Sequence, residues 1–520
     1  MPRRDRAQRA PADDAVQGVQ AESVDEQDAE PIARLDRWAI GGALLWALGL
    51  ALLFFYLLVY VAHTANLAAY PYDLDQGEGY DVNSGWLIAQ GRPIYTDNEQ
   101  FPYYSSNYPP VFSVLLAAIV AQTGPTLAAG RLVSAAAALA CVALVTLVVE
   151  RRSGSGVAPL TAGLLFISSP YVFHTTPLAR VNALALFFAL VGLACCYGRG
   201  HGWTVGVVAA FLLALFTKQT TLDAVGAGLV ALLLRDVRLG LVTGLVVAFL
   251  GAVGLLLIDT AHDGAFWTNV VVGNANTLDL KQVVDYYRNF LELHAVVVVL
   301  AGWQVALAVR ARRLGPFELY WLFSLLWAIS VGKWGAGESY FLAPIAASAV
   351  LAGQRLAEIG SHAERQSWRL AAVGVLVVTQ GLLFSHGPLY LLGPVFVDRG
   401  AQASVLSRFP GKNEVDAASE LVRTLREADG PVLLEDPSYG MAAGKEVVGN
   451  ATQLRNLHLV GSWDPDPLIA DLRERRFSWV VLDAQLYPEP ILAAIGKYYY
   501  LYEEYEINGT RQQLFAPGAE

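Results

Sequence analysis

The chain has 520 residues, of which 55% are hydrophobic and only 16% are charged, and its net charge is −10. Soluble proteins carry about 25% charged residues, so this composition excludes an ordinary soluble protein and indicates an integral membrane protein. No basic, aromatic-rich stretch accompanies the acidic charge, which argues against a nucleic-acid partner.

Residues 1–33 are rich in Ala, Gln, Asp, Glu and Arg and contain no aromatic residue. This composition predicts a disordered cytoplasmic tail. A long polar tail before the first apolar run, Trp38–Ala62, predicts an uncleaved signal anchor in place of a cleaved signal peptide. Residues 34–386 are then predicted to form a transmembrane core, with a long first outer loop over 63–130.

Crossing the hydrocarbon core of a bilayer takes roughly 20 apolar residues. On that basis we predict an all-α polytopic membrane protein with about eleven transmembrane helices. The candidate spans are Trp38–Ala62, Leu127–Val149, Val157–Val172, Leu178–Tyr197, Trp203–Phe216, Thr220–Leu234, Leu239–Ile258, His294–Val309, Phe317–Val331, Tyr340–Leu356 and Leu370–Phe384. The apolar stretch Val111–Ala121 is too short to span, so it predicts a helix at the membrane surface or packed inside the first loop.

Lys and Arg in short loops predict the orientation of the chain, because cytoplasmic loops carry an excess of basic residues. With the N-terminus in the cytoplasm, the basic clusters fall on one side. They are Arg34 and Arg37, Arg151 and Arg152, Arg199, Arg235 and Arg238, Arg310 to Arg313, and Arg355 to Arg369. The protein is therefore predicted to be a multi-pass protein of the cell membrane, with its first long loop and its C-terminal region outside the cytoplasm.

Residues 410–517 are predicted to form a small extracytoplasmic α/β domain. Two amphipathic stretches, "VDAASELVRTLREADG" and "PLIADLRERR", predict helices, and "PVLLED" and "FSWVVLDA" predict buried strands. Helices that alternate with strands are typical of an α/β fold.

The densest acidic cluster, "DLDQGEGYDV", follows the first span and contains Asp73, Asp75, Glu78 and Asp81. Gly77 and Gly79 allow sharp turns and the close approach of a ligand. The next residues, "YDVNSGWLIAQGRPIY", predict a short helix that ends at Gly91. Carboxylates on such a turn suit a general base or a metal ligand, and the alternative is a solvated acidic loop.

Further polar residues lie at span ends on the same predicted side of the membrane. They are Arg180 in "HTTPLARVN", Lys218 in "FTKQTTLD", and Lys333 and Glu338 in "GKWGAGESYF". Ionic groups near a bilayer are costly unless they are paired or functional. The three cations together predict a site for a lipid-linked phosphate, whereas each alone also fits a paired or snorkelling structural residue.

Several features together resemble the GT-C-type membrane glycosyltransferases. They are the acidic turn after the first span, the downstream Gly91-Arg-Pro-Ile-Tyr and Tyr108-Pro-Pro segments, the Gly130-Arg-Leu-Val-Ser-Ala segment, and an outer domain after many spans. The family includes the protein O-mannosyltransferases and the bacterial aminoarabinose transferases. The resemblance implies inverting transfer of a sugar from a polyprenyl-phosphate-linked donor to a glycan, lipid or protein acceptor at the outer membrane face.

The resemblance also implies roles for particular residues. It makes Asp75 or Glu78 the base that activates the acceptor hydroxyl, with Asp73 and Asp81 as reserves. Phosphate binding falls to Arg131, Arg180, Lys218 or Lys333. Tyr108 stands where relatives often carry a Lys before the Pro-Pro pair, and it joins Asp73, Asp81 and Glu338 among the predicted substrate-binding residues.

Other readings remain open at this point. No cofactor is indicated and no Cys/His metal spacing appears, although a divalent metal at the loop carboxylates remains an option. The three cysteines lie in apolar runs and predict small residues that fill helix contacts. An oligosaccharide ligase or polymerase, a polytopic transporter, and a membrane scaffold with an outer binding domain are the alternative functions.

Overall fold

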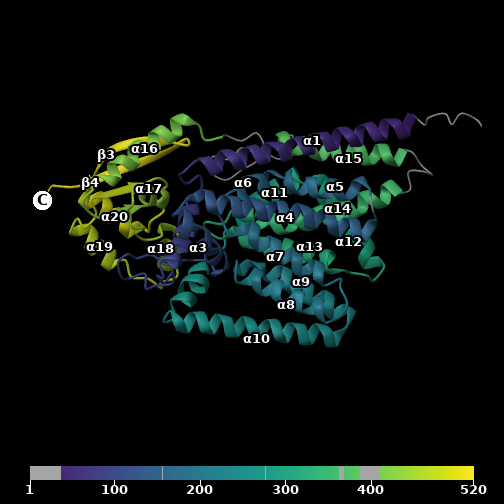
Figure 1. Cartoon of the computed structure of the whole chain (residues 1–520), viewed down its shortest axis with the longest axis horizontal. Helices are drawn as coiled ribbons and strands as arrows, with labels where there is room; N and C mark the ends of the chain where they lie inside the picture. Colours follow the sequence, from purple (N-terminus) through teal and green to yellow (C-terminus); the bar gives the residue numbers. More distant parts are fainter. Residues whose placement is uncertain (1–36, 155, 276, 362–367, 387–408, 520) are drawn as a thin grey trace, which may run out of the picture.

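Long helices run side by side through the body of the protein, and a small mixed sheet lies at one end of them (Figure 1). The structure is a computed structural model, and it describes residues 37–154, 156–275, 277–361, 368–386 and 409–519. The predicted disordered tail, residues 1–33, lies outside the described residues.

The helical body is built from the first part of the chain. Its elements are α1 (Arg37–Ala69), α2 (Glu78–Ala89), α3 (Val111–Thr123), α4 (Leu127–Ser153), α5 (Val157–Ile167), α6 (Pro170–Thr175), α7 (Asn182–Cys195), α8 (His201–Leu215), η1 (Gln219–Thr221), α9 (Leu222–Arg235), α10 (Val237–Ala261), η2 (Trp267–Val271), η3 (Val272–Asn274), α11 (Leu280–Leu293), α12 (Ala295–Arg310), α13 (Pro316–Trp327), η4 (Ala328–Gly332), η5 (Glu338–Phe341), α14 (Leu342–Ser361) and α15 (Trp368–His386). The predicted short helices in the first outer loop are both present, as α2 and α3.

The number of long apolar helices is smaller than predicted. Four within the described residues are long and apolar enough to cross a membrane: Arg37–Ala69, Leu127–Ser153, Val237–Ala261 and Glu338–Ser361. A fifth is obtained if α11 and α12, which meet at a bend of 92°, count as one span. These helices are those of a membrane protein, but the predicted count of about eleven is not confirmed.

Polar residues account for the difference, because they end several helices early. The predicted span Val157–Val172 breaks at Ser168 and Ser169, and α5 has only 11 residues. The span expected from Leu178 begins at Asn182, so α7 has 14 residues. At 1.5 Å per residue such a helix covers about 21 Å, less than the thickness of the hydrocarbon core.

Small residues allow the helices of the body to pack closely. A Cβ atom on Gly42 of α1 would lie 2.4 Å from the backbone nitrogen of Ala371 in α15, and one on Gly353 of α14 would lie 2.5 Å from Cβ of Ala162 in α5. Such contacts between small residues are typical of helices packed in a membrane.

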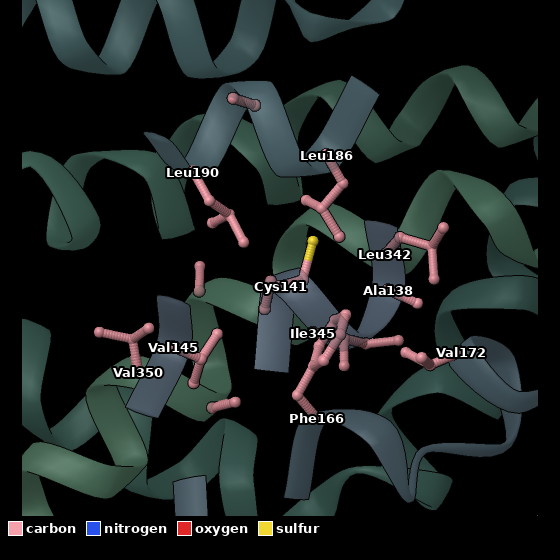
Figure 2. Close-up of a cluster of buried hydrophobic side chains, with 14 of the residues drawn as sticks. Ala138, Cys141, Val145, Phe166, Val172, Leu186, Leu190, Leu342, Ile345 and Val350 are labelled. Atoms are coloured by element: carbon pink, nitrogen blue, oxygen red, sulfur yellow. The ribbon is translucent and has the colours of Figure 1, made fainter. Parts of the chain in front are cut away.

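Cys141 of α4 lies at the centre of the apolar core, in contact with side chains from α5, α7 and α14 (Figure 2). It is buried, and all three cysteines are free. The prediction that they fill helix contacts is confirmed for Cys141.

Basic loop residues gather at the end of the body where α4 terminates. The guanidinium of Arg152 lies 4.7 Å from the Tyr197 ring centroid, and Nη1 of Arg235 donates to the carbonyls of Cys196 (2.9 Å) and Gly198 (2.7 Å). Arg131 lies near the start of the same α4 helix, about 30 Å from Arg152 at 1.5 Å per residue. Arg152 and Arg235, from two of the predicted basic clusters, therefore lie far from the start of α4.

The C-terminal residues form an α/β arrangement that contains the four predicted elements. Its elements are α16 (Lys412–Arg426), β1 (Val432–Leu434), α17 (Pro437–Ala442), α18 (Ala451–Leu459), α19 (Asp466–Arg473), β2 (Trp479–Leu482), α20 (Glu489–Tyr498), β3 (Tyr499–Ile507) and β4 (Thr510–Pro517). The strand order is β1-β2-β4-β3, with β1 parallel to β2 and the other neighbours antiparallel. The β3–β4 hairpin was not predicted.

Hydrogen bonds attach the C-terminal part to the outer loops of the body. Nε1 of Trp463 donates to the carbonyl of Asn98 (2.8 Å), and the hydroxyl of Tyr80 donates to the carbonyl of Glu435 (3.0 Å). Nε2 of Gln453 donates to the carbonyl of Asn269 (2.7 Å). Because all of these groups are buried or nearly so, the C-terminal part is held in a fixed position over the loops.

Candidate active site

A cavity of about 360 Å³ lies between the helical body and the C-terminal part. The first outer loop, the α6–α7 connection, the α8–η1 connection, and the loop before α14 all contribute to it. Eight predicted site residues line this cavity: Asp73, Asp75, Asp81, Tyr108, Arg180, Lys218, Lys333 and Glu338. The structure thus brings together residues from four separate segments, while Glu78 and Arg131 lie behind the cavity wall.

The turn between α1 and α2 carries Asp75 into the cavity. The Asp75 side chain is 48% exposed, and its Oδ2 lies 3.2 Å from Nη1 of Arg180. Its Oδ1 accepts a longer hydrogen bond, 3.4 Å, from the backbone of Gly77. Asp75 therefore combines access to the cavity with a neighbouring positive charge.

Arg180 connects three of the predicted site residues. Besides its contact with Asp75, its Nε lies 3.3 Å from Oδ2 of Asp81, and its Nη2 donates to the hydroxyl of Tyr108 (3.3 Å). The guanidinium also lies 5.9 Å from the centroid of the Tyr108 ring. A planar guanidinium suits several oxygen partners at once, so Arg180 fixes the relative positions of these groups.

Gly77 provides the space that Arg180 occupies. A Cβ atom at this position would lie 1.2 Å from Nη1 of Arg180. The φ angle of Gly77 is −83°, which any residue can adopt. The glycine is therefore needed for the close approach of a protein side chain, and not for a left-handed turn.

Asp81 and Lys218 are both buried next to Arg180. Burial raises the pKa of Asp81 to about 7, against the opposing effect of Arg180. Burial, followed by the charge of Arg180, lowers the pKa of Lys218 to about 8. Nζ of Lys218 donates to Oδ1 of Asn182 (2.7 Å) and lies 5.0 Å from the Tyr340 ring centroid.

The loop before α14 brings Lys333 and Glu338 to the cavity. Nε2 of Gln282, on α11, donates to the carbonyls of Val331 (2.7 Å) and Lys333 (3.1 Å), which fixes the loop backbone. Nζ of Lys333 donates to the carbonyl of Asn274 (3.0 Å), and burial lowers the pKa of this lysine. Glu338 lies at the start of η5 and is buried.

Glu78 forms a buried ion pair with Arg131 behind the cavity, and both side chains are 0% exposed. Oε1 of Glu78 accepts hydrogen bonds from Nε of Arg131 (2.7 Å) and from the backbone nitrogen of Ala179 (2.8 Å). Oε2 accepts from Nη2 of Arg131 (2.7 Å) and from the backbone nitrogen of Leu74 (3.0 Å). Burial alone would raise the pKa of Glu78, but Arg131 outweighs it and lowers this pKa. The position does not favour the base role predicted for Glu78, nor the phosphate contact predicted for Arg131.

Asp73 joins the first loop to the C-terminal part. Its backbone donates to Oγ of Ser438 (2.8 Å), and its Oδ2 accepts from the backbone of Ser438 (3.2 Å). Oδ1 of Asp73 accepts from the backbone of Gly79 (2.8 Å). Burial, with the nearby charge of Glu78, raises the pKa of Asp73. Asp73 therefore braces the turn that carries Asp75.

The sequence prediction missed the part of the cavity wall that the C-terminal residues supply. This wall includes Asp436, Asn450, Thr452, Asp483 and Gln512. These residues lie more than 350 positions after the acidic cluster Asp73–Asp81 in the sequence, and no short motif marks them. Asp483 follows strand β2 directly, and Asp436 follows β1 after Glu435. The carboxyl ends of parallel strands are a frequent position for binding residues.

Within the described ranges, no group of three or more His, Cys, Asp or Glu side chains is placed to hold a metal ion. The divalent metal considered from the sequence therefore stays a prediction.

The fold is similar to that of ArnT from Cupriavidus metallidurans. The ArnT structure bound to undecaprenyl phosphate matches with a TM-score of 0.54 and 15% identity, over 92% of this chain and 99% of ArnT. The apo structure of ArnT matches with a TM-score of 0.55 and 14% identity, over 90% and 99% of the two chains. The chain has the GT-C glycosyltransferase fold.

An oligosaccharyltransferase from Archaeoglobus fulgidus, solved in complex with zinc and sulfate, matches with a TM-score of 0.44 and 14% identity, over 90% of this chain and 73% of that one. No protein-family model and no curated protein sequence matches the chain. The likeness to ArnT is therefore one of fold.

Proposed function

We propose that the protein is an inverting glycosyltransferase, which moves a sugar from a polyprenyl-phosphate-linked donor to an acceptor hydroxyl. The observation that carries this proposal is a single cavity, lined by the half-exposed carboxylate of Asp75 and by the cations Arg180, Lys218 and Lys333. ArnT, which shares the fold, has been solved with bound undecaprenyl phosphate, and this supports a polyprenyl-phosphate donor.

In the proposed reaction the acceptor oxygen attacks the anomeric carbon of the donor sugar. The new bond forms between that oxygen and the anomeric carbon, and the bond from the carbon to the phosphate oxygen breaks. Asp75 takes the acceptor proton, because a carboxylate within hydrogen-bond reach makes a hydroxyl a better nucleophile. Arg180, Lys218 and Lys333 stabilise the negative charge on the departing polyprenyl phosphate.

The remaining predicted site residues receive supporting roles in this proposal. The ion pair of Glu78 and Arg131 holds the turn against α4, because both side chains are fully buried and Arg131 belongs to α4. Asp73 fixes the turn from the side of the C-terminal part, and Asp81 orients Arg180. Tyr108 contacts the guanidinium, and Glu338 lies in the cavity wall near Lys333.

The proposed orientation of the chain in the membrane follows from the distribution of its basic residues. Loops with many basic residues lie at the far end of α4, so we assign that end to the cytoplasm. The cavity and residues 410–517 then lie outside the cytoplasm. A polyprenyl donor would keep its chain in the lipid and place its phosphate at the cavity.

The decisive experiment is an assay of the purified full-length protein with radiolabelled polyprenyl-phosphate sugars and a mixture of acceptors. Consumption of the donor, with release of polyprenyl phosphate, is the expected result. Movement of a solute across proteoliposomes, without consumption of any donor, would instead identify a transporter.

Lys218 gives the reaction a predicted dependence on pH. Because its pKa is about 8, the fraction of charged lysine, and with it donor affinity, falls as the pH rises through 8. We expect kcat/KM for the donor to decline between pH 7.5 and 9, since this ratio reports the free enzyme. In Lys218→Arg the guanidinium stays charged, so the decline should move up by at least about one pH unit. An unchanged profile would exclude Lys218 from phosphate binding.

The space at Gly77 gives a second prediction. In Gly77→Ala the new methyl group overlaps with Arg180, so Arg180 and Asp75 shift and kcat falls by roughly 100-fold, as expected for displacements of about 1 Å. The matched control is Gly202→Ala on α8, because a Cβ there meets nothing within 4 Å. Equal activity of the two variants would contradict the arrangement proposed for Arg180.

A further inference from the structure

The cavity has two chemically different walls. The helical body contributes the cations Arg180, Lys218 and Lys333. Among the described residues that line the cavity, the C-terminal part contributes no Lys or Arg. Its hydrogen-bonding side chains there include Asp436, Thr452, Asn456, Asp483, Thr510 and Gln512. We refer to these six residues as the C-terminal wall.

A buried carboxylate fixes the loop that carries part of this wall. Glu435 is 0% exposed, and its Oε2 accepts from the backbone nitrogens of Asp483 (2.7 Å), Ala484 (2.9 Å) and Gln485 (3.1 Å). Its Oε1 accepts from the next two backbone nitrogens, those of Leu486 and Tyr487. Five consecutive N–H groups therefore converge on one side chain. The position of Asp483 is set before any ligand binds, which lowers the entropic cost of binding.

The wall also contains a polar atom that lacks a partner. Gln512 of β4 is 1% exposed, and its Nε2 donates to Oδ2 of Asp436 (3.2 Å). Its Oε1 makes no hydrogen bond within the described ranges of the chain. A buried acceptor without a donor is destabilising, and a hydroxyl of a molecule bound in the cavity is the kind of donor that would satisfy it.

We infer that the C-terminal wall binds the acceptor, and that this acceptor is an uncharged, hydroxyl-rich saccharide. The inference rests on the proposed function and adds the substrate class. Carboxylate, amide and hydroxyl side chains alternate as acceptors and donors, which matches the neighbouring hydroxyls of a sugar. The carboxylates of Asp436 and Asp483 repel phosphate or uronate groups. Asp75 lines the same cavity, so a saccharide hydroxyl held by the wall is presented to the proposed base.

Binding to the donor-free, full-length protein tests the inference separately from transfer. The probes are neutral di- to tetrasaccharides of glucose, galactose, mannose and arabinose, compared with uronic-acid oligosaccharides of the same length, and binding is measured by calorimetry or saturation-transfer NMR. Neutral saccharides from this panel should bind at least about tenfold more tightly than their charged counterparts.

Two variants distinguish recognition from a general loss of structure. The double variant Asp436→Asn/Asp483→Asn removes the repulsion of uronate groups. Its affinities for neutral and for uronic-acid saccharides should therefore differ by no more than about threefold. Asp429→Asn, an exposed position outside the cavity, should keep the preference. If the double variant fails to fold, Thr452→Val provides the test, because the Thr452 hydroxyl donates to Gln76 (3.2 Å) at the cavity and its loss should weaken neutral saccharide binding severalfold.

Several results would overturn the inference. They are tighter binding of uronic-acid saccharides, no binding by any saccharide of the panel, or acceptance of the sugar only by an anionic lipid or a peptide. Donor consumption without saccharide binding would refute this inference alone, whereas saccharide binding without donor consumption would refute the proposed function.

Discussion

Replacing Asp75 with asparagine is expected to lower kcat for sugar transfer by about 10²- to 10⁴-fold, the usual contribution of a general base. Asparagine has nearly the same shape as aspartate but cannot accept the proton. Donor KM should change little, because Arg180, Lys218 and Lys333 remain in place. The measurement is the initial rate of radiolabel transfer by the purified variant, at saturating donor.

The matched control for Asp75→Asn is Asp416→Asn, which changes an exposed carboxylate on α16 away from the cavity. It should transfer sugar at the wild-type rate. If Asp75→Asn also keeps the wild-type kcat, Asp75 is not the base. A large rise in KM with an unchanged kcat would instead make Asp75 a binding residue.

Replacing Arg131 with methionine is expected to destabilise the protein by about 3–5 kcal/mol, because it leaves a charged carboxylate buried without its partner. The change also removes the donors to the carbonyls of Leu67 (2.6 Å) in the last turn of α1, and of Tyr70 (2.5 Å) and Tyr72 (2.7 Å) just after it. Thermal and denaturant unfolding in detergent, with the free energy of unfolding compared to wild type, measure the effect.

Arg92→Met is the matched control, because Arg92 pairs with Glu446 where both side chains are partly exposed, 47% and 39%. This surface pair should contribute less than about 1 kcal/mol. The double variant Glu78→Leu/Arg131→Leu removes both charges and should recover part of the stability lost in Arg131→Met. Comparable destabilisation by Arg92→Met and Arg131→Met would show that the buried pair has no special role.

The sequence indicated which residues gather at the cavity, but not what each of them contacts there. Acidic and basic residues were expected on one side of the membrane because of hydropathy and loop charge, and seven of them, with Tyr108, line one cavity. The partner of Glu78 could not be predicted, because Arg131 lies 53 residues further along the chain. Only the packing of α4 against the first loop brings the two together.

The hydropathy pattern also did not predict the lengths of the helices. Hydropathy averages over a window, so it did not register the helix break at Ser168 and Ser169 or the α6–α7 connection that carries Arg180. Short helices with polar ends leave room for side chains that enter the cavity.

The β3–β4 hairpin, in contrast, is marked in the sequence by a short turn motif. Asn508 and Gly509 both have positive φ angles, 54° and 72°, and an Asn-Gly pair between two apolar-polar alternations is typical of a two-residue hairpin turn. This hairpin carries Thr510 and Gln512 into the cavity wall, so recognising it would have indicated part of the missed site.

The contact between Asp73 and Ser438 has a consequence for biosynthesis. The two residues are 365 positions apart, and Ser438 follows every described helix of the membrane body in the chain. Since a chain emerges from the ribosome from its N-terminus, the membrane helices are made while the turn that carries Asp75 still lacks its brace. The cavity is thus completed only when nearly the whole polypeptide has been synthesised.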